Sequence, residues 1–362
     1  MFRETIEKMA PYTPGEQPRP GERLIKLNTN ENPYPPSPRV RRAVARIAAA
    51  SLRLYPAPRA DEFVASASKL YGVRKNMILA GNGSDELLTM IFRASLGPRD
   101  TVAYPVPTYS LYDTLATIQE ARVIRFPVAK DFSIPLGELA KARAKLTIVC
   151  SPNSPSGILT PTSKLADLAK ALGNRLLVID EAYVDFADEN AIALLRRFPN
   201  VVILRTLSKS FSLAGMRLGL CFARPKIIDH LMKVKDSYNL SRVALVAGAE
   251  ALNDSEWMRR NVERVKHTRE TSIKRLRRMG FEVPDSSANF VLARIGGRDL
   301  APLVAAIRKA GILVRHFANP MLRDAMRISI GTPAEMNALF NAIDANFKRL
   351  KLDGSAIRNK VR

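Results

Sequence analysis

The chain has few cysteines and few histidines, and each shortage excludes a class of protein. Among its 362 residues are 2 cysteines and 3 histidines. Cys150 and Cys221 are too few for a disulfide framework, and their apolar, strand-like surroundings are typical of a reducing compartment. The histidines are spread along the chain without the spacing of paired metal ligands, so we expect no metal centre.

Long hydrophobic runs are also absent. No apolar stretch approaches the roughly 20 residues that span a membrane. Residues 1–10 mix charges where a secretory signal would have an apolar core. We therefore expect a cytoplasmic protein that does not contact a membrane. A composition of 46% hydrophobic and 25% charged residues is typical of a globular protein, and the length allows two domains.

Acidic residues are scarce relative to basic ones, since 34 Asp and Glu stand against 57 Lys and Arg and give a net charge of +23. Such an excess can serve nucleic acid, an anionic surface or small anionic ligands. The basic residues are concentrated in two places: the run 259–278, in a helix predicted over 255–279, and the C-terminal tail. In neither place do aromatic residues alternate with the charges, as stacking on bases would require. The pattern favours a solvated cationic surface over a nucleic-acid site.

The hydrophobic pattern predicts an α/β fold. Prolines recur through residues 1–38, which predicts an extended arm without a helix, followed by a helix over 39–51. From there to residue 222, largely apolar runs alternate with helical patterns, as in a mostly parallel sheet covered by helices. The predicted strands are 77–80, 101–104, 122–126, 146–150, 176–179, 201–204 and 218–222, and the predicted helices between them are 86–94, 109–119, 163–172 and 191–198.

Beyond residue 225 the pattern changes to that of a smaller α+β domain. After the long basic helix come strands predicted at 281–283, 289–293, 312–315 and 326–329, with helices at 300–310 and 334–348. We predict three segments: an N-terminal arm and first helix over 1–50, packing on the small domain or on a partner subunit, a large cofactor-binding domain over 51–250, and the small domain over 251–362.

The segment after the predicted strand 201–204 carries the strongest chemical signal. Thr206 and Ser208 place two hydroxyls at the strand end, Lys209 follows at once, and Arg217 comes later in the same segment. Hydroxyls and a guanidinium at a strand end suit a bound phosphate. A lysine held near other cations and partly desolvated has a lowered pKa and can act as an amine nucleophile. A serine-rich surface turn with a solvated lysine is the alternative.

A second signal is a carboxylate at a strand end. Asp180 follows the apolar run 176–179 and so reaches the edge where ligands bind in open α/β sheets. A carboxylate there can pair with a protonated ring nitrogen, which the pyridinium of pyridoxal phosphate requires. Tyr183 could hydrogen-bond the hydroxyl of that ring. The alternative is an aspartate that caps the next helix.

Three weaker patterns follow other predicted strands. A Gly-Asn-Gly turn precedes Ser84 and Asp85, whose amides at a helix N-terminus can bind an anion. Tyr109 could stack on a flat heterocycle, and Asn153, between two prolines, could donate to a phenolate oxygen. Each pattern has an alternative explanation. The acidic residues after Ser84 could complement the helix dipole, Tyr109 could be a core tyrosine, and the segment around Asn153 could be a plain turn. Chance is a poor explanation for all five patterns at consecutive strand ends.

Together these segments resemble the fold-type I pyridoxal-phosphate-dependent aminotransferases, and within them the histidinol-phosphate aminotransferase subfamily. The Ser-Lys pair with its downstream arginine is specific for this class, and the resemblance covers nearly the whole chain. It implies a large domain with a mostly parallel sheet sandwiched by helices, plus a smaller α+β domain. The segments that carry it are 11–15, 27–33, 81–86, 107–109, 153–157, 180–183, 206–217, 289–290, 311–315 and 326–332.

The resemblance also implies a role for each candidate residue. Lys209 would hold pyridoxal 5'-phosphate as a Schiff base, Asp180 would pair with its ring nitrogen, and Tyr183 would complete the catalytic set. The further cofactor contacts would be Asn153 beside Tyr183 at the 3-oxygen, Tyr109 on the ring, and Ser84, Asp85, Thr206, Ser208 and Arg217 at the phosphate. In a homodimer Tyr55 would reach the neighbouring subunit's cofactor. Arg327 would clamp the anionic group of the substrate, with Arg315 and Tyr12 nearby.

The implied reaction is a transamination between two small anions. L-Histidinol phosphate and 2-oxoglutarate would give imidazole acetol phosphate and L-glutamate, a step in histidine biosynthesis. Two alternatives share the fold, namely an aromatic amino-acid aminotransferase and a phosphothreonine-type decarboxylase. A third, suggested by the charge of +23, is a nucleic-acid-binding protein on a vestigial aminotransferase fold.

Overall fold

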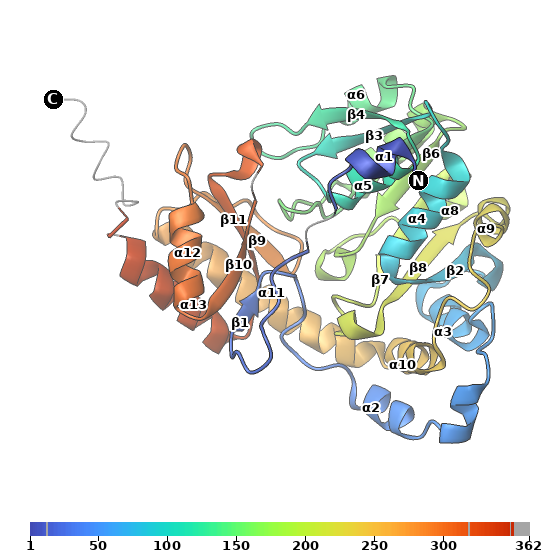
Figure 1. Ribbon diagram of the computed structural model, residues 1–362, viewed down its shortest axis with the longest axis horizontal. Helices are drawn as coiled ribbons and strands as arrows, with labels where there is room; N and C mark the ends of the chain where they lie inside the picture. The colour runs from blue at the N-terminus through green and yellow to red at the C-terminus, as the bar shows by residue number, and fades with distance from the viewer. Residues whose placement is uncertain (12–13, 318, 348, 351–362) are drawn as a thin grey trace.

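The protein is built around two β-sheets of different size, seen at the right and left of the computed structural model in Figure 1. The structure describes residues 1–11, 14–317, 319–347 and 349–350. The larger sheet has seven strands and the smaller sheet has four. Each sheet is covered by helices that bury its apolar side chains, so the fold class predicted from the hydrophobic pattern is confirmed.

The large sheet has the strand order β2-β8-β7-β6-β5-β3-β4. Its strands are β2 (Ile78–Asn82), β3 (Thr101–Val106), β4 (Arg122–Pro127), β5 (Leu146–Cys150), β6 (Leu176–Asp180), β7 (Val201–Thr206) and β8 (Leu218–Ala223). β8 runs antiparallel to both its neighbours, and the pairings among β3 to β7 are parallel. Consequently β5, β6 and β7 deliver the residues after their carboxyl ends to one edge of the sheet.

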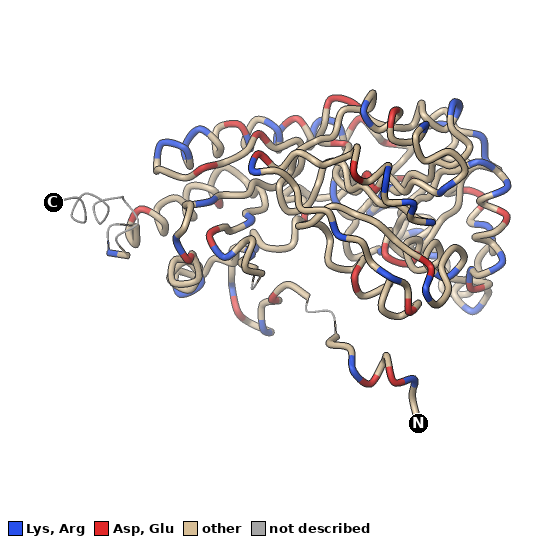
Figure 2. Tube along the Cα trace, turned by 90° about the horizontal axis from the view of Figure 1, so that it is seen from above, with Lys and Arg blue, Asp and Glu red and all other residues tan. Residues whose placement is uncertain are grey.

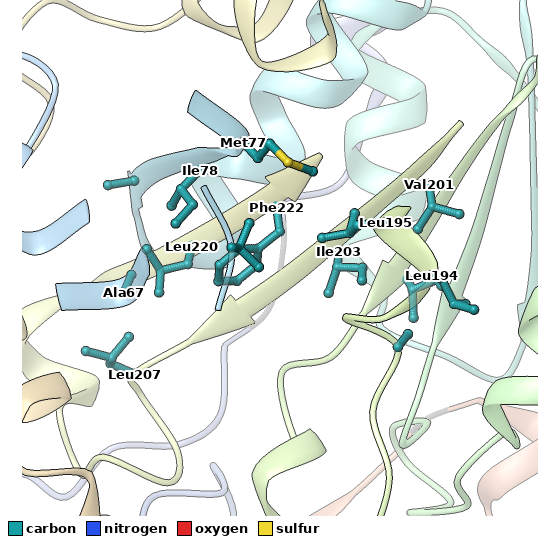
Figure 3. Close-up of a cluster of buried hydrophobic side chains, with 14 of the residues drawn as sticks. Ala67, Met77, Ile78, Leu194, Leu195, Val201, Ile203, Leu207, Leu220 and Phe222 are labelled. Carbon is teal, nitrogen blue, oxygen red and sulfur yellow. The ribbon is translucent and has the colours of Figure 1, made fainter. Parts of the chain in front are cut away.

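Helices cover both faces of the large sheet because successive strand residues point to opposite sides. In β7, Val201 and Ile203 belong to one buried cluster, whereas Val202 and Leu204 belong to another. Figure 3 shows part of the first cluster, in which Ile203 lies beside Phe222, its register partner on β8, and Leu220 lies on the other side of Phe222. The helices around this sheet are α3 (Asp61–Tyr71), α4 (Gly83–Ser95), α5 (Leu111–Ile118), α6 (Leu136–Lys141), α7 (Thr162–Leu172), α8 (Leu194–Arg197), α9 (Pro225–Met232) and α10 (Arg242–Asn253), with 3-10 turns η2 (Lys75–Met77), η3 (Val184–Phe186) and η4 (Ala214–Met216).

The small sheet has the order β1-β10-β11-β9 and its own apolar core. Its strands are β1 (Ile25–Leu27), β9 (Phe290–Arg294), β10 (Ile312–His316) and β11 (Ala325–Ser329), accompanied by α11 (Ser255–Arg278), α12 (Ala301–Lys309), η5 (Pro320–Leu322) and α13 (Pro333–Phe347). Val265 and Leu276 of α11 pack in this core with Leu339 of α13. The long basic helix is therefore amphipathic, with its apolar stripe against the small sheet.

The N-terminal segment differs from the prediction of an extended arm without a helix. Residues Glu4–Lys8 form α1, ahead of the first proline, so the proline argument does not reach them. Residues Ile25–Leu27 form β1, which pairs in parallel with β10. A strand of 3 residues is too short to leave a periodic pattern in the sequence.

Three predicted elements are divided or greatly reduced in the structure. The helix predicted over 39–51 divides into α2 (Pro38–Ala45) and the 3-10 turn η1 (Ala49–Arg53). The helix predicted over 191–198 is reduced to α8. The strand predicted at 281–283 is a single bridge between Glu282 and Arg294. Helices α3 and α6 lie outside the predicted set.

Charged residues are distributed over the described chain, with acidic and basic positions interspersed along the trace in Figure 2. On α11, Arg259 pairs with Glu256, and Lys266 lies within ion-pair distance of Asp188 and Glu263. Of the tail's basic residues, those from 351 onward and Lys348 lie outside the described residues. Within the described ranges, no helix combines the length and apolarity needed to cross a bilayer.

Candidate active site

The carboxyl edge of the large sheet brings the main candidate residues together. Asp180 is the last residue of β6 and lies opposite Cys150 of β5 and Leu204 of β7 in the strand register. Asn153 lies in the turn after β5, and Lys209 lies in the turn after β7. Because these three strands are adjacent and parallel, three residues far apart in the sequence share one edge.

Asp180 is a buried carboxylate with two hydrogen-bond donors. Its side chain receives the Tyr112 hydroxyl at 2.7 Å and the Ala182 amide at 3.2 Å. Burial raises the pKa of Asp180 to about 6, and these hydrogen bonds offset part of that rise. Near neutral pH the group remains largely an anion, but an imperfectly compensated one. Such a carboxylate suits a cationic partner at this edge.

Lys209 is an amine of depressed basicity. Its Nζ donates to the Thr29 carbonyl oxygen at 3.1 Å. Burial and then the charge of Arg327 lower the pKa of Lys209 to about 8, against the opposing pull of Glu31. A lysine with this pKa carries a larger fraction of the neutral, nucleophilic form near pH 7 than an ordinary lysine does. The geometry therefore fits a reactive amine.

The start of α4 and the residues around Arg217 form a cradle of donors. Arg217 Nη2 lies 2.9 Å from Asp85, and Arg217 Nη1 donates to the Ser208 hydroxyl at 3.4 Å. Thr206 donates to Ser208 at 2.9 Å. Ser84 and Asp85 lie in the first turn of α4, where backbone amides are available to an anion. Arg217 adopts a left-handed backbone conformation with φ of 52°, which is uncommon outside glycine.

Two glycines allow the parts of this cradle to approach closely. Gly83 belongs to the Gly-Asn-Gly turn that the sequence indicated, whereas Gly219 was given no role in the sequence analysis. A Cβ added to Gly219 would lie 2.5 Å from the Gly83 carbonyl carbon and 2.6 Å from the Ser84 nitrogen. A Cβ added to Gly83 would lie 2.6 Å from Arg217 Nη2, and Gly83 has φ of 80°. Any larger residue at position 219 would push the first turn of α4 away from β8. The signal in the sequence is only an isolated glycine in a strand, which is common.

Three polar or aromatic candidates surround the Asp180–Lys209 region and are hydrogen-bonded within the protein. The Tyr183 hydroxyl accepts from Asn30 at 3.1 Å, and burial raises the pKa of Tyr183 to about 12. Asn153 donates to the Pro107 carbonyl at 3.1 Å. The Tyr109 hydroxyl donates to Asp85 at 3.1 Å, so Asp85 accepts from both Tyr109 and Arg217. The carboxylate of Asp85 therefore orients two other candidates, a role that the sequence did not indicate.

The small sheet supplies the candidate substrate residues. Arg327 of β11 donates to the Ser154 hydroxyl at 3.0 Å and to the Asn28 carbonyl at 2.9 Å. Arg315 of β10 lies opposite Arg327 in the register and donates to the Pro14 carbonyl at 3.2 Å. Tyr12 lies outside the described residues. Two guanidinium groups on adjacent strands provide positive charge and several N–H donors that suit an anion.

Tyr55 lies at the surface rather than among the buried candidates. Its side chain is 78% exposed and stacks on Tyr238 with ring centroids 4.4 Å apart. Leu52 and Leu54, 57% and 52% exposed, lie beside it in the chain. Within one chain, Tyr55 therefore belongs to an exposed apolar surface next to η1.

The segment 28–31 contacts several candidates and was identified in the sequence only as part of the resemblance. Asn28 and Thr29 present carbonyls to Arg327 and Lys209, and Asn30 donates to Tyr183. Asn30 is 1% exposed with φ of 58°, and its backbone N–H donates to Ser329 of β11 at 2.8 Å. Asparagines such as Asn28 and Asn30 indicate a turn in the sequence. The residues that this turn contacts are distant in the chain and cannot be deduced from spacing.

These residues fit pyridoxal phosphate. The start of α4 and Arg217 offer donors to a phosphate, and Gly83 lets the Arg217 guanidinium approach the backbone there. The buried Asp180 can receive a ring cation, and Lys209 is an amine of lowered pKa. Within the described residues, no cluster of three or more histidines, cysteines or carboxylates could hold a metal ion.

Comparison with known proteins identifies the family. The model of class I and II aminotransferases matches residues 22–343. Histidinol-phosphate aminotransferase 1 of Trichormus variabilis is 44% identical over 342 residues, which cover 94% of this chain and 97% of the relative. The histidinol-phosphate aminotransferase of Citrifermentans bemidjiense is 45% identical over the same shares of both chains. The crystal structure of the Sinorhizobium meliloti enzyme in complex with pyridoxal-5'-phosphate superposes with a TM-score of 0.88 at 26% identity, covering 96% of this chain and 98% of that one.

The chain is thus an aminotransferase of class I and II. Within that class it belongs to the histidinol-phosphate aminotransferases. The fold-type I architecture and the subfamily that the sequence motifs indicated are confirmed.

Replacing Gly219 with alanine is expected to damage the cradle selectively. The added Cβ meets backbone atoms that cannot rotate away, and overpacking of this kind costs about 1–3 kcal/mol. Chemical unfolding of the cofactor-free protein should show this loss, and the affinity for pyridoxal phosphate should fall. Gly215→Ala is the matched control, because its Cβ would meet nothing within 4 Å. Equal behaviour of the two variants would contradict this role of Gly219.

Proposed function

We propose that the protein transfers the amino group of L-histidinol phosphate to 2-oxoglutarate, giving imidazole acetol phosphate and L-glutamate, with pyridoxal 5'-phosphate as cofactor. One observation carries the proposal. Asp180 ends β6 and Lys209 follows the adjacent strand β7, so a buried carboxylate and a lysine of lowered pKa lie at the same edge of the sheet. The names of the relatives that are 44% and 45% identical favour this reaction over an aromatic aminotransferase or a decarboxylase.

In this mechanism the protein's residues divide into a binding set and a proton-handling set. Bound pyridoxal phosphate would supply an electron sink for the substrate carbon that loses its proton. Ser84, Thr206, Ser208 and Arg217 would bind the phosphate, and Asp180 would balance the ring charge. Asn153 and Tyr183 would donate to the ring oxygen, and Tyr109 would cover the ring.

Lys209 would act twice through its Nζ. As a nucleophile it would hold the cofactor between turnovers, and once displaced by the substrate amine it would act as a general base. Its lowered pKa leaves a usable fraction of neutral amine near pH 7, which is what proton removal from carbon requires. The same Nζ, then protonated, would return the proton to the cofactor side.

Arg327 would bind the anionic end of each substrate in turn, with Arg315 and Tyr12 nearby. The donor carries a phosphate and the acceptor carries a carboxylate, so one site must accept two anions of different shape. A guanidinium matches both groups with paired donors. The positions of Arg315 and Arg327 opposite each other in the register support this assignment.

A donor panel with the purified holoenzyme tests the reaction. We expect L-histidinol phosphate to convert the cofactor's visible absorbance to that of its aminated form, and 2-oxoglutarate to restore it. Activity only with phenylalanine or tyrosine, or carbon dioxide release from phosphothreonine, would contradict the proposal. Salt-sensitive binding of duplex DNA by a colourless protein would favour the nucleic-acid alternative.

We also propose that the active unit is a cytoplasmic homodimer in which Tyr55 reaches the partner's cofactor phosphate. The exposed surface of Leu52, Leu54 and Tyr55 supports an interface, since three large apolar side chains exposed within four consecutive residues are typical of an interaction site. Cys150 and Cys221 are both buried and free, which suits a reducing cytoplasm.

Mixed dimers test the contribution of Tyr55. Subunits carrying Tyr55→Ala and subunits carrying Lys209→Ala are each expected to be poorly active alone. A heterodimer of the two contains one complete site, because the Lys209→Ala subunit donates an intact Tyr55 to its partner. We expect it to recover about half of the wild-type activity. No recovery in a heterodimer verified by mass would contradict the shared site.

A further inference from the structure

We propose that Tyr112 is a positioning residue for the cofactor ring: its hydroxyl holds the Asp180 carboxylate in place and in its charged form. The inference rests on the proposed cofactor chemistry. It starts from one contact, in which Tyr112 Oη donates to Asp180 Oδ2 at 2.7 Å. Tyr112 is 0% exposed and Asp180 is 3% exposed, so water cannot replace this donor freely.

The fold fixes the Tyr112 ring independently of Asp180. Tyr112 is the second residue of α5, and its ring packs edge-on against Tyr109 and at a tilt against Tyr104, with centroids 5.7 Å apart in both cases. Its backbone N–H donates to the Tyr109 carbonyl. Tyr109, the proposed stacking residue, and Tyr112 are therefore placed by the same turn.

The charges around Asp180 explain why this donor matters. Besides Tyr112, the titratable groups that interact with it are carboxylates or weak acids: Asp85 from α4, Glu181 next in the chain, Cys150 from β5 and Tyr183 after β6. Burial is the largest influence and raises the pKa of Asp180, as Asp85 and Glu181 also do, whereas the Tyr112 hydroxyl and the Ala182 amide lower it. Tyr112 is thus one of two donors that oppose protonation.

Tyr112 itself stays protonated under all ordinary conditions. Burial, followed by the charge of Asp180, raises the pKa of Tyr112 well above its usual range. The hydroxyl is therefore a permanent donor, and Asp180 is the member of the pair that titrates. Removing the hydroxyl should raise the pKa of Asp180 further, so that the carboxylate is lost at a higher pH.

The chain offers a matched control for Tyr112→Phe. Tyr104 is also 0% exposed, and its hydroxyl also donates to an aspartate, Asp113, at 2.6 Å. Asp113 is 43% exposed and pairs with Arg125 at the surface. Tyr104→Phe therefore removes a buried tyrosine hydroxyl from the same aromatic cluster without touching Asp180. Both substitutions keep the ring volume, which cores tolerate best.

The experiment measures the dissociation constant of pyridoxal phosphate from the cofactor-free protein between pH 5.5 and 8.5. We expect Tyr112→Phe to weaken binding by about 10-fold near pH 6, as loss of a hydrogen bond to a charged group does, and by less at pH 8. The ratio to wild type should therefore grow as the pH falls. Titration of the cofactor's phosphate affects both proteins equally and cancels in that ratio.

Tyr104→Phe should give a small ratio that does not depend on pH. A Tyr112→Phe ratio that is flat with pH, or a Tyr104→Phe ratio that grows in the same way as the pH falls, would overturn the inference. If wild type itself does not bind pyridoxal phosphate, the proposed function fails instead, so the two failures are distinguishable.

Discussion

Replacement of Lys209 by alanine is expected to lower kcat for transamination by at least about 10⁴-fold, the upper end of what general acid–base catalysis alone contributes. The substitution removes the nucleophile and the proton acceptor at once, because the same Nζ serves both steps in the proposed mechanism. Steady-state assays with L-histidinol phosphate and 2-oxoglutarate measure the loss. The visible spectrum should also show that the cofactor is no longer bound covalently.

Lys170→Ala is a suitable control for this prediction, since Lys170 is an exposed lysine of α7. It should retain wild-type kcat and the wild-type spectrum. A Lys209→Ala protein with normal turnover would remove the basis of the mechanism. Added primary amines that restored part of the activity would instead support a role for the amine in proton transfer.

Replacement of Asp180 by asparagine is expected to lower kcat/KM by about 10² to 10³-fold. Breaking a buried charge pair by removing one partner costs about 3–5 kcal/mol, and here the cofactor's ring cation would lose its counter-charge. The amide keeps the shape of the carboxylate and can still accept from Tyr112. The measured loss therefore reports charge rather than packing.

The same Asp180→Asn substitution should lower activity without lowering the stability of the cofactor-free protein. The pKa of Asp180 is raised from 3.8 to about 6 in the folded state. The folded protein binds this proton more tightly than the unfolded chain does, so this group's contribution to stability falls as the pH rises through that window. Above pH 6, cofactor-free Asp180→Asn should therefore be at least as stable as wild type.

Thermal unfolding at pH 5 and pH 8 checks this, with exposed Asp229 of α9, replaced by Asn, as the control. A variant that is both inactive and strongly destabilised at pH 8 would indicate that Asp180 is a structural residue. A variant that is stable but inactive supports the charge-pairing role.

The sequence predicted the large sheet well because its strands are buried on both faces. The run 201–204 is wholly apolar, 146–150 is apolar except for Thr147, and β5 and β7 are buried at every position. Once the strands were placed, parallel order alone brought Asp180 and Lys209 to one edge. The sequence did not indicate β1, because this strand exists by pairing with β10 near the other end of the chain.

The site's supporting residues were harder to predict for the same reason. Tyr112 looks like an ordinary core residue in the sequence, and only the fold shows its hydroxyl against Asp180. Gly219 is an isolated glycine until β8 is seen to touch the start of α4. Motif spacing finds groups that carry chemistry, but the contacts that orient those groups depend on tertiary packing.

The short stretch at residues 28–30 has a practical consequence. Its contacts with Arg327, Lys209 and Tyr183 draw together side chains from both sheets through consecutive residues near the beginning of the chain. A version translated from a later start codon, or clipped by a protease beyond residue 31, would still contain the amine, the acid and the glycines of the phosphate cradle. It would nevertheless lose the segment that connects side chains from the two sheets at the candidate site, so the integrity of the amino terminus should be verified before any inactive preparation is interpreted.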